Sequence, residues 1–170
     1  VGADVDGLST GESVILLGRE NWVQKRRVKA AEVLKIEVQS DRLLQYAMLK
    51  VNPATAALML REYVNLKAGD WVIQDAANSG VGHCLIQLAR KAGIKTVNVV
   101  RRESLVEPLK AYGADVVLVG LDDLGERVNA ATAGGHVRLA IDAVAGNTSL
   151  RLAECLSDGG MMVNYGMLSG

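Results

Sequence analysis

The chain has 170 residues, and its 19 lysines and arginines balance its 19 aspartates and glutamates, so the formal net charge is zero. Hydrophobic residues make up 49% and charged residues 22%, a composition typical of a folded domain with its own core. Neutrality argues against a nucleic-acid binder, which needs a basic face, and against electrostatic attachment to anionic membranes. No apolar stretch approaches the ~20 residues of a membrane helix. The two distant cysteines form neither a disulfide framework nor a zinc-binding spacing.

The first 50 residues have the pattern of short strands and turns. Residues 13–17 follow the turn signal Thr10-Gly11 and predict a buried strand. Residues 22–37 mix valine and leucine with charges and predict two more strands. The chain begins without an initiator methionine or a signal peptide and stops just after a strand-like run, so we expect it to be a fragment.

From residue 51 onward, helical and strand patterns alternate. A helix is expected over residues 53–63, with Pro53 in its first turn and Asn52 as its cap. Apolar strands are expected at 71–77, 96–100, 116–119, 137–144 and 161–165, with helices between them at 80–91, 104–112, 122–132 and 149–156. Such alternation predicts the α/β class, with a doubly wound parallel sheet covered on both faces. Five strands fit most of a dinucleotide-binding (Rossmann) fold, without its last strand.

The turn from Ala77 to Gly82 (Ala-Asn-Ser-Gly-Val-Gly) stands where the first of these strands meets the next helix. A pyrophosphate needs close backbone approach and helix N–H groups at such a turn. As a match to G-x-G-x-x-G the turn is weak, because Ala77 and Ser79 occupy two of the three glycine positions. Its location favours a phosphate cradle formed by Asn78, Ser79, Gly80, Val81 and Gly82. A plain glycine-containing turn is the alternative.

Two adjacent arginines directly follow the strand expected at residues 96–100, about 20 residues beyond the turn. A cofactor with a free ribose 2′-hydroxyl favours Asp or Glu there, whereas this sequence has Arg101 and Arg102. A planar guanidinium suits a 2′-phosphate through paired hydrogen bonds, so the chemistry favours NADPH over NADH. Ordinary surface charge is the alternative, and Glu103 directly after the pair would weaken the preference.

The ends of the later strands are also expected to face the cofactor, because ligands bind at the carboxyl edge of such a sheet. The last strand runs into Tyr165, Gly166, Met167 and Leu168, which we expect to line the nicotinamide pocket. A catalytic acid is the alternative role for Tyr165. Neither histidine has Cys, Asp or Glu at a metal-binding spacing, so no metal site is expected.

Three segments, at residues 51–56, 69–82 and 98–102, resemble the medium-chain dehydrogenase/reductase superfamily. The closest likeness is to its zinc-free, mitochondrial-type 2-enoyl thioester reductases. The Asn-Ser-Gly-Val-Gly form of the turn is fairly specific to that branch, since quinone reductases more often carry Gly-Gly-Val-Gly. The resemblance implies that residues 1–50 are an incomplete β-rich GroES-like catalytic domain. Residues 51–170 would then be the Rossmann domain.

The resemblance implies an oxidoreductase that uses NADPH to reduce trans-2-enoyl-CoA or an enoyl-acyl-carrier protein. It assigns Asn52 to the nicotinamide end, residues 78–82 to the pyrophosphate, Arg101 and Arg102 to the 2′-phosphate, and residues 165–168 to the nicotinamide side. The proton-donating tyrosine of that family lies before anything present here, so this chain alone is expected to be inactive.

Further expectations concern partners, metal and location. The stretch from Lys50 to Ala54 lacks the cysteine ligand of zinc-dependent alcohol dehydrogenases, which favours zinc independence. Members of the enoyl reductase family are often homodimers, and the partner expected here is a small molecule rather than nucleic acid or membrane. The expected location is cytoplasmic, or the mitochondrial matrix if the source is a eukaryote. An NADPH quinone oxidoreductase and a non-catalytic nucleotide-binding module are the alternative functions.

Overall fold

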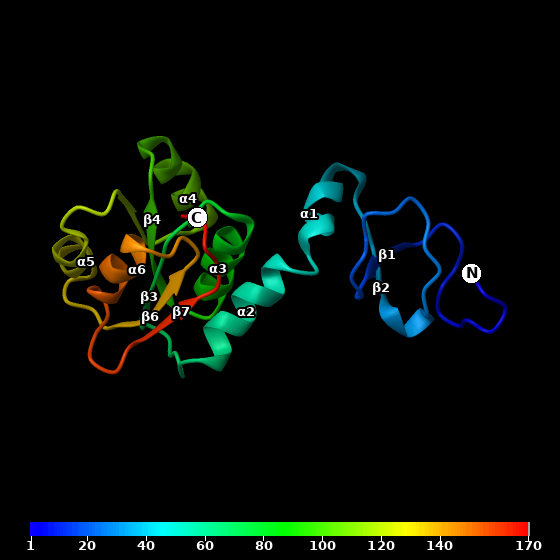
Figure 1. The fold of residues 1–170 in the computed structure, drawn as a ribbon, viewed down its shortest axis with the longest axis horizontal. Helices are drawn as coiled ribbons and strands as arrows, with labels where there is room; N and C mark the ends of the chain where they lie inside the picture. Colours follow the sequence, from blue (N-terminus) through cyan, green and yellow to red (C-terminus); the bar gives the residue numbers. More distant parts are fainter. Residues whose placement is uncertain (170) are drawn as a thin grey trace. The chain divides into compact units, whose positions relative to one another are not determined.

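The computed structural model describes residues 1–169, and the chain divides into two compact units, Val1–Val51 and Asn52–Gly170 (Figure 1). In the first unit, β1 (Ser13–Leu16) pairs antiparallel with β2 (Val33–Ile36). Short 3-10 turns at Ala30–Glu32 and Ser40–Arg42 and the helix α1 (Leu43–Met48) complete its regular structure. No residue of this unit is buried.

One of the two strands expected within residues 22–37 does not form. The segment 22–29, which carries four basic side chains, is irregular and almost entirely exposed, and its backbone pairs with no strand. A strand needs partners for its backbone groups and a buried face, and this segment has neither. The expectation of two strands there was therefore wrong, and β2 alone forms.

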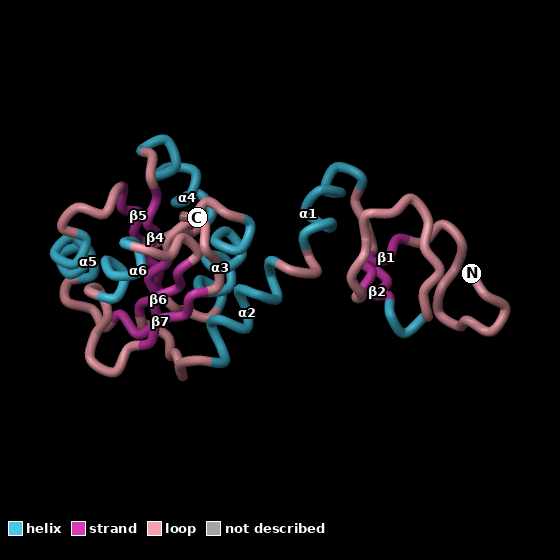
Figure 2. The backbone as a smooth tube through the Cα atoms, viewed as in Figure 1, coloured by secondary structure: helices cyan, strands magenta, loops and turns pink. Residues whose placement is uncertain are grey.

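The second unit is built on a five-stranded parallel sheet with the order β5-β4-β3-β6-β7 (Figure 2). The central strand β3 pairs with β4 on one side and β6 on the other. The strand bounds are β3 (Trp71–Gln74), β4 (Lys95–Val100), β5 (Val116–Val119), β6 (Val137–Asp142) and β7 (Met161–Asn164). The sequence expectation of a doubly wound parallel sheet is confirmed.

Helices cover both faces of this sheet, as Figure 1 shows. On one face lie α2 (Asn52–Glu62), α3 (Gly80–Lys91) and α4 (Val106–Tyr112), which follows the 3-10 turn Glu103–Leu105. On the other face lie α5 (Leu124–Thr132) and α6 (Asn147–Ala153). Val72 packs in the cluster under α2 and α3, whereas its neighbour Ile73 packs under α5 and α6. This alternation along a strand explains why every strand residue of β3 is buried.

The exact ends of several elements differ from expectation for local backbone reasons. The strand β3 stops at Gln74 instead of residue 77, because Ala76 has a left-handed φ of 41°. The strand β6 stops at Asp142, because the next N–H groups bond carboxylates: that of Ala143 donates to Asp75, and those of Val144 and Ala145 donate to Asp142. Asn52 lies inside α2 as its first residue, so its assignment as the cap was wrong by one position.

Candidate functional site

The sheet reverses its winding direction at β3, because the chain goes on to β4 on one side and reaches β6 on the other. In open α/β sheets, ligands bind beyond the carboxyl ends of the strands at such a reversal. A cleft of about 270 Å³ lies there, between the ends of β3, β4, β5 and β6. Its lining residues are Asp75, Ala76, Asn78, Ser79, Val99, Val100, Arg101, Arg102, Leu105, Gly120, Leu121, Val144, Thr148 and Leu168.

The turn into α3 forms one wall of the cleft and is built for an anion. The Oγ of Ser79 accepts the N–H of Gly82 at 3.0 Å, which caps the helix. The N–H groups of Gly80 and Val81 have no acceptor within the helix and remain available to a ligand. A Cβ built on Gly82 would lie 2.4 Å from the carbonyl oxygen of Ala77, so only glycine lets α3 pack this closely on the end of β3. The turn therefore fits a phosphate group.

Two cationic side chains lie across the cleft from this turn. Arg101 and Arg102 follow β4 directly, and both are exposed. Within residues 1–169, neither forms an ion pair with an acidic side chain. Leu105 and Leu121 contribute apolar surface to the same cleft. Together these groups provide an apolar slot beside two free guanidinium groups, a donor set that fits an adenosine carrying an additional phosphate.

The structure brings some of the predicted residues together and separates others. Asn78, Ser79, Arg101, Arg102 and Leu168 line the cleft. The first three residues of α3, Gly80, Val81 and Gly82, are outside the residues that line the cleft. Tyr165 is half-buried and hydrogen-bonds Ser79, and Gly166 packs against the backbone of Ala143. Met167 is exposed beside Leu168, and Asn52 lies at the start of α2, outside the residues that line the cleft.

A pair of buried carboxyl groups at the edge of the cleft had no counterpart in the sequence expectations. Asp75 follows β3 and is 3% exposed, and Asp142 ends β6 and is fully buried. Asp75 accepts the N–H groups of Ala143 at 2.7 Å and Val144 at 3.3 Å. Asp142 accepts the same Val144 N–H at 3.0 Å. The only sequence signal was an acidic residue at the end of each of two apolar runs.

The two carboxyl groups differ in their affinity for a proton. Burial, followed by the hydrogen bond and Coulombic repulsion from Asp142, raises the pKa of Asp75 to about 7. Burial also acts to raise the pKa of Asp142, but hydrogen bonds from Asp75, Ser149, the Ala145 backbone and Asn164 outweigh it and lower that pKa to about 2. Burial raises the pKa of Tyr165 despite its hydrogen bond with Ser79.

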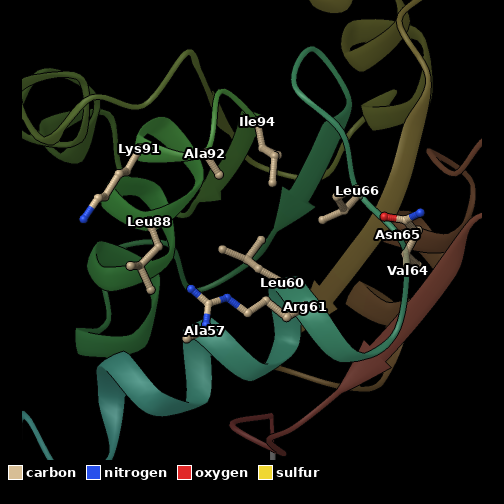
Figure 3. Close-up of a pocket in the computed structure, with 10 residues that line it drawn as sticks. All are labelled: Ala57, Leu60, Arg61, Val64, Asn65, Leu66, Leu88, Lys91, Ala92 and Ile94. Atoms are coloured by element: carbon tan, nitrogen blue, oxygen red, sulfur yellow. The ribbon is translucent and has the colours of Figure 1, made fainter.

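A second cavity, of about 420 Å³, lies at the opposite edge of the sheet (Figure 3). Its walls come from α2, from the loop that leads into β3, and from the end of α3. Arg61 and Lys91 are its charged members, and its remaining residues are apolar apart from Asn65. It contains none of the predicted site residues.

Two features are absent from residues 1–169. No group of three or more His, Cys, Asp and Glu side chains is arranged to hold a metal ion. No helix in this part of the chain has the length and apolarity needed to cross a bilayer.

Comparison with known proteins places these features in a family. Residues 80–170 match the family described as zinc-binding dehydrogenase. The mitochondrial enoyl-[acyl-carrier-protein] reductase of Caenorhabditis elegans is 39% identical over 99% of this chain and 49% of its own length. The chain thus spans about half the length of the curated relatives it matches.

Solved structures agree with this result. The complex of Etr1p with NADP and crotonyl-CoA superposes with a TM-score of 0.83 at 26% identity, covering 99% of this chain and 53% of that one. A quinone oxidoreductase of Pseudomonas syringae superposes with a TM-score of 0.73 at 28% identity, covering 82% of this chain and 43% of that one. The chain therefore belongs to the zinc-binding dehydrogenase family, within the medium-chain dehydrogenase/reductase superfamily.

Proposed function

We propose that this chain carries the cofactor-binding part of an NADPH-dependent reductase of α,β-unsaturated (enoyl) thioesters. The observation that carries the proposal is the cleft that unites the Asn78–Ser79 turn with Arg101 and Arg102. The similarity to mitochondrial enoyl-acyl-carrier-protein reductases over almost the whole chain supports the substrate class. When bound, NADPH would supply a hydride from its nicotinamide ring to the β-carbon of an enoyl-CoA or enoyl-acyl-carrier protein.

The residues of the chain hold and orient the cofactor in this proposal. The available N–H groups of Gly80 and Val81 bind the pyrophosphate at the positive end of α3. Arg101 and Arg102 bind the 2′-phosphate, and Leu105 and Leu121 cover the adenine ring. Asn52 and residues 165–168 line the nicotinamide end. Tyr165 serves as a wall of that pocket, where its side chain is half-buried.

The proton donor for the reduced substrate would come from a tyrosine outside this chain, as the family resemblance implies. This chain alone is then a cofactor-binding module without turnover. The full-length protein would act in the cytoplasm, or in the mitochondrial matrix if its source is a eukaryote, as the named relatives are mitochondrial.

Cofactor titration tests the phosphate assignment directly. We expect NADPH to bind this chain more tightly than NADH when each is titrated and followed by nicotinamide fluorescence. Replacing both arginines (Arg101→Ala with Arg102→Ala) should weaken NADPH by about 1.5–3 kcal/mol per lost contact and leave NADH nearly unchanged. The matched control removes two cations from the other cavity, Arg61→Ala with Lys91→Ala, and should change neither affinity. Equal losses for both cofactors in the Arg101/Arg102 variant would contradict the assignment.

A quinone oxidoreductase is the second candidate, favoured by the similarity to the Pseudomonas syringae structure. The two functions differ in the electron acceptor and share the cofactor cleft. Full-length protein given NADPH should reduce crotonyl-CoA and leave simple quinones unreacted. Reduction of quinones with crotonyl-CoA untouched would replace the first candidate with the second.

A further inference from the structure

The carboxyl groups of Asp75 and Asp142 lie close together at the point where β3 and β6 end. Their proximity follows from a shared donor, because the N–H of Val144 is 3.3 Å from Oδ2 of Asp75 and 3.0 Å from Oδ1 of Asp142. Asp75 also receives the N–H of Ala143 at 2.7 Å. Each carboxyl group is therefore held in place by backbone donors from the same turn.

The remaining partners of Asp142 come from β7, from α6 and from the turn after β6. Its Oδ2 accepts a hydrogen bond from Asn164 at 2.9 Å and one from the hydroxyl of Ser149, while Oδ1 accepts the N–H of Ala145 at 2.8 Å. The carboxylate of Asp142 thus joins β6, β7 and α6. Asp75 adds β3 to this network through the turn at residues 143–144.

No cation neutralises the pair. Within residues 1–169, no lysine, arginine or histidine forms an ion pair with either carboxyl group, although both are buried. The ionisable groups around the site are Tyr165 after β7, which stays neutral because its pKa is raised, and the exposed Arg101 and Arg102 across the cleft. The turn before α3 contributes the hydroxyl group of Ser79, and α6 contributes that of Ser149. Two buried negative charges that share one backbone donor repel each other strongly, so the pair is stable with one shared proton.

We propose that Asp75 and Asp142 form an acid–carboxylate pair that holds one proton, and that cofactor binding in the adjoining cleft requires this proton. The proposal rests on the proposed function, since it makes Asp75 a positioning residue of the NADPH site. Asp142 remains ionised and fixes the turn after β6. Asp75 remains neutral and presents no charge to the cleft that it lines.

The consequence is a cofactor affinity linked to a proton near neutral pH. When Asp75 ionises, a second negative charge appears in the cleft wall beside the turn that we assign to the pyrophosphate, and it repels the polyanionic cofactor. The second charge also repels Asp142 and loosens the turn that carries Val144 and, beyond it, Thr148 of the cleft. The raised pKa of Asp75 places this change close to pH 7. NADPH binding then takes up a proton above that pH.

The test measures NADPH affinity of this chain between pH 6 and pH 9 in three proteins: the unchanged chain, Asp75→Asn and Asp158→Asn. Asparagine at position 75 imitates the protonated acid, with an amide that can donate to Asp142 and a carbonyl that can accept from Ala143. Asp158→Asn is the charge-matched control, because Asp158 is exposed and precedes β7 at the opposite edge of the sheet. Asp75→Asn and Asp158→Asn are measured with the same NADPH, so titration of the cofactor's own phosphate affects both equally.

We expect the dissociation constant of the unchanged chain and of Asp158→Asn to rise above pH 7, approaching tenfold per pH unit. Asp75→Asn should bind NADPH with nearly constant affinity over the same range. Parallel pH profiles for all three proteins would overturn the proposal.

A measurement without cofactor separates this proposal from the proposed function. Carbon-13 NMR of the side-chain carboxyl groups should show one of the pair titrating near neutral pH and the other remaining ionised. If NADPH binds at no pH, the proposed function fails and the cofactor linkage fails with it, while the NMR titration still decides whether the shared proton exists. Two ordinary titrations near pH 4 would refute the pair even if NADPH binds.

Discussion

The two units of this chain contain similar proportions of apolar residues but bury them to different extents. Asn52–Gly170 buries side chains on both faces of a parallel sheet, in clusters that include Val72, Ile73 and Leu139. Val1–Val51 buries none, and large apolar side chains such as Trp22 and Leu34 are exposed. A two-stranded ribbon without a buried face has little stability of its own. We therefore expect the second unit to be the more stable of the two, because it alone has a buried core.

The largest expected effect comes from removing a core side chain in each unit. Leu139→Ala empties a fully buried position in β6 and should lower the free energy of unfolding by about 2–5 kcal/mol. Leu34→Ala in β2 changes a side chain that is 54% exposed and should cost less than about 0.5 kcal/mol. Urea denaturation followed by circular dichroism measures both. Similar losses in the two variants would show that the first unit has a core of its own.

The carboxyl pair gives the second unit a pH dependence that reaches neutral pH. The folded-state pKa of Asp75, about 7, lies above its ordinary value of 3.8, so the folded chain holds the proton more tightly than the unfolded chain. This stabilisation is complete below about pH 4 and is lost as the pH rises to 7, on the order of 4 kcal/mol in all.

Denaturation at several pH values checks this prediction. Asp75→Asn should remove the fall in the free energy of unfolding between pH 4 and 7. It should leave the loss of stability at acid pH, where Asp142 loses its stabilising charge as the pH falls from about 4 toward 2. An unchanged slope between pH 4 and 7 in this variant would show that another group is responsible.

Two helical glycines provide a sharper comparison within the second unit. Gly82→Ala places a methyl group 2.4 Å from the carbonyl oxygen of Ala77 and should cost about 1–3 kcal/mol, with loss of cofactor affinity. Gly125→Ala in α5 meets its nearest atom at 3.8 Å and should stabilise by about 0.5–1 kcal/mol. Thermal denaturation compares them, and equal effects would mean that α3 can move away from β3 without penalty.

The smallest expected effect concerns helix capping. Ser79→Ala removes the oxygen that accepts the Gly82 N–H and should cost about 1 kcal/mol. Arg42 precedes α1 without a side-chain capping bond, so Arg42→Ala should leave stability unchanged. Melting temperatures of the two variants measure the difference, and a loss with Arg42→Ala alone would reverse the expected order.

The same contrast explains which features the sequence predicted. In the second unit, apolar strands alternate with amphipathic helices, and all five strands and their connecting helices form within a few residues of expectation. The ends were missed where a single residue decides them: Ala76 turns left-handed, and Asp142 binds the N–H groups that follow it. In the first unit no residue is buried, so an apolar pattern alone does not decide which segments form strands. The expected strand near residues 22–29 did not form.

The candidate site was partly predictable for a comparable reason. The Asn78–Ser79 turn and Arg101–Arg102 were predicted to lie at one edge because each follows a strand, and the two segments do line one cleft. The Asp75–Asp142 pair was missed because its two members are far apart in sequence, and their meeting depends on β3 and β6 being neighbours. Sequence pattern predicts such elements more readily than their order in a sheet.

Hydrogen exchange of this chain with and without NADPH tests the cofactor cleft most directly. NADPH should slow exchange at residues 78–82, where the α3 N–H groups bind phosphate, and around residues 101–105, while residues 1–51 stay unchanged. NADH at the same concentration should protect the α3 turn less and the arginine segment hardly at all. Protection confined to the cavity between α2 and α3, or none at either segment, would contradict the proposed cofactor site.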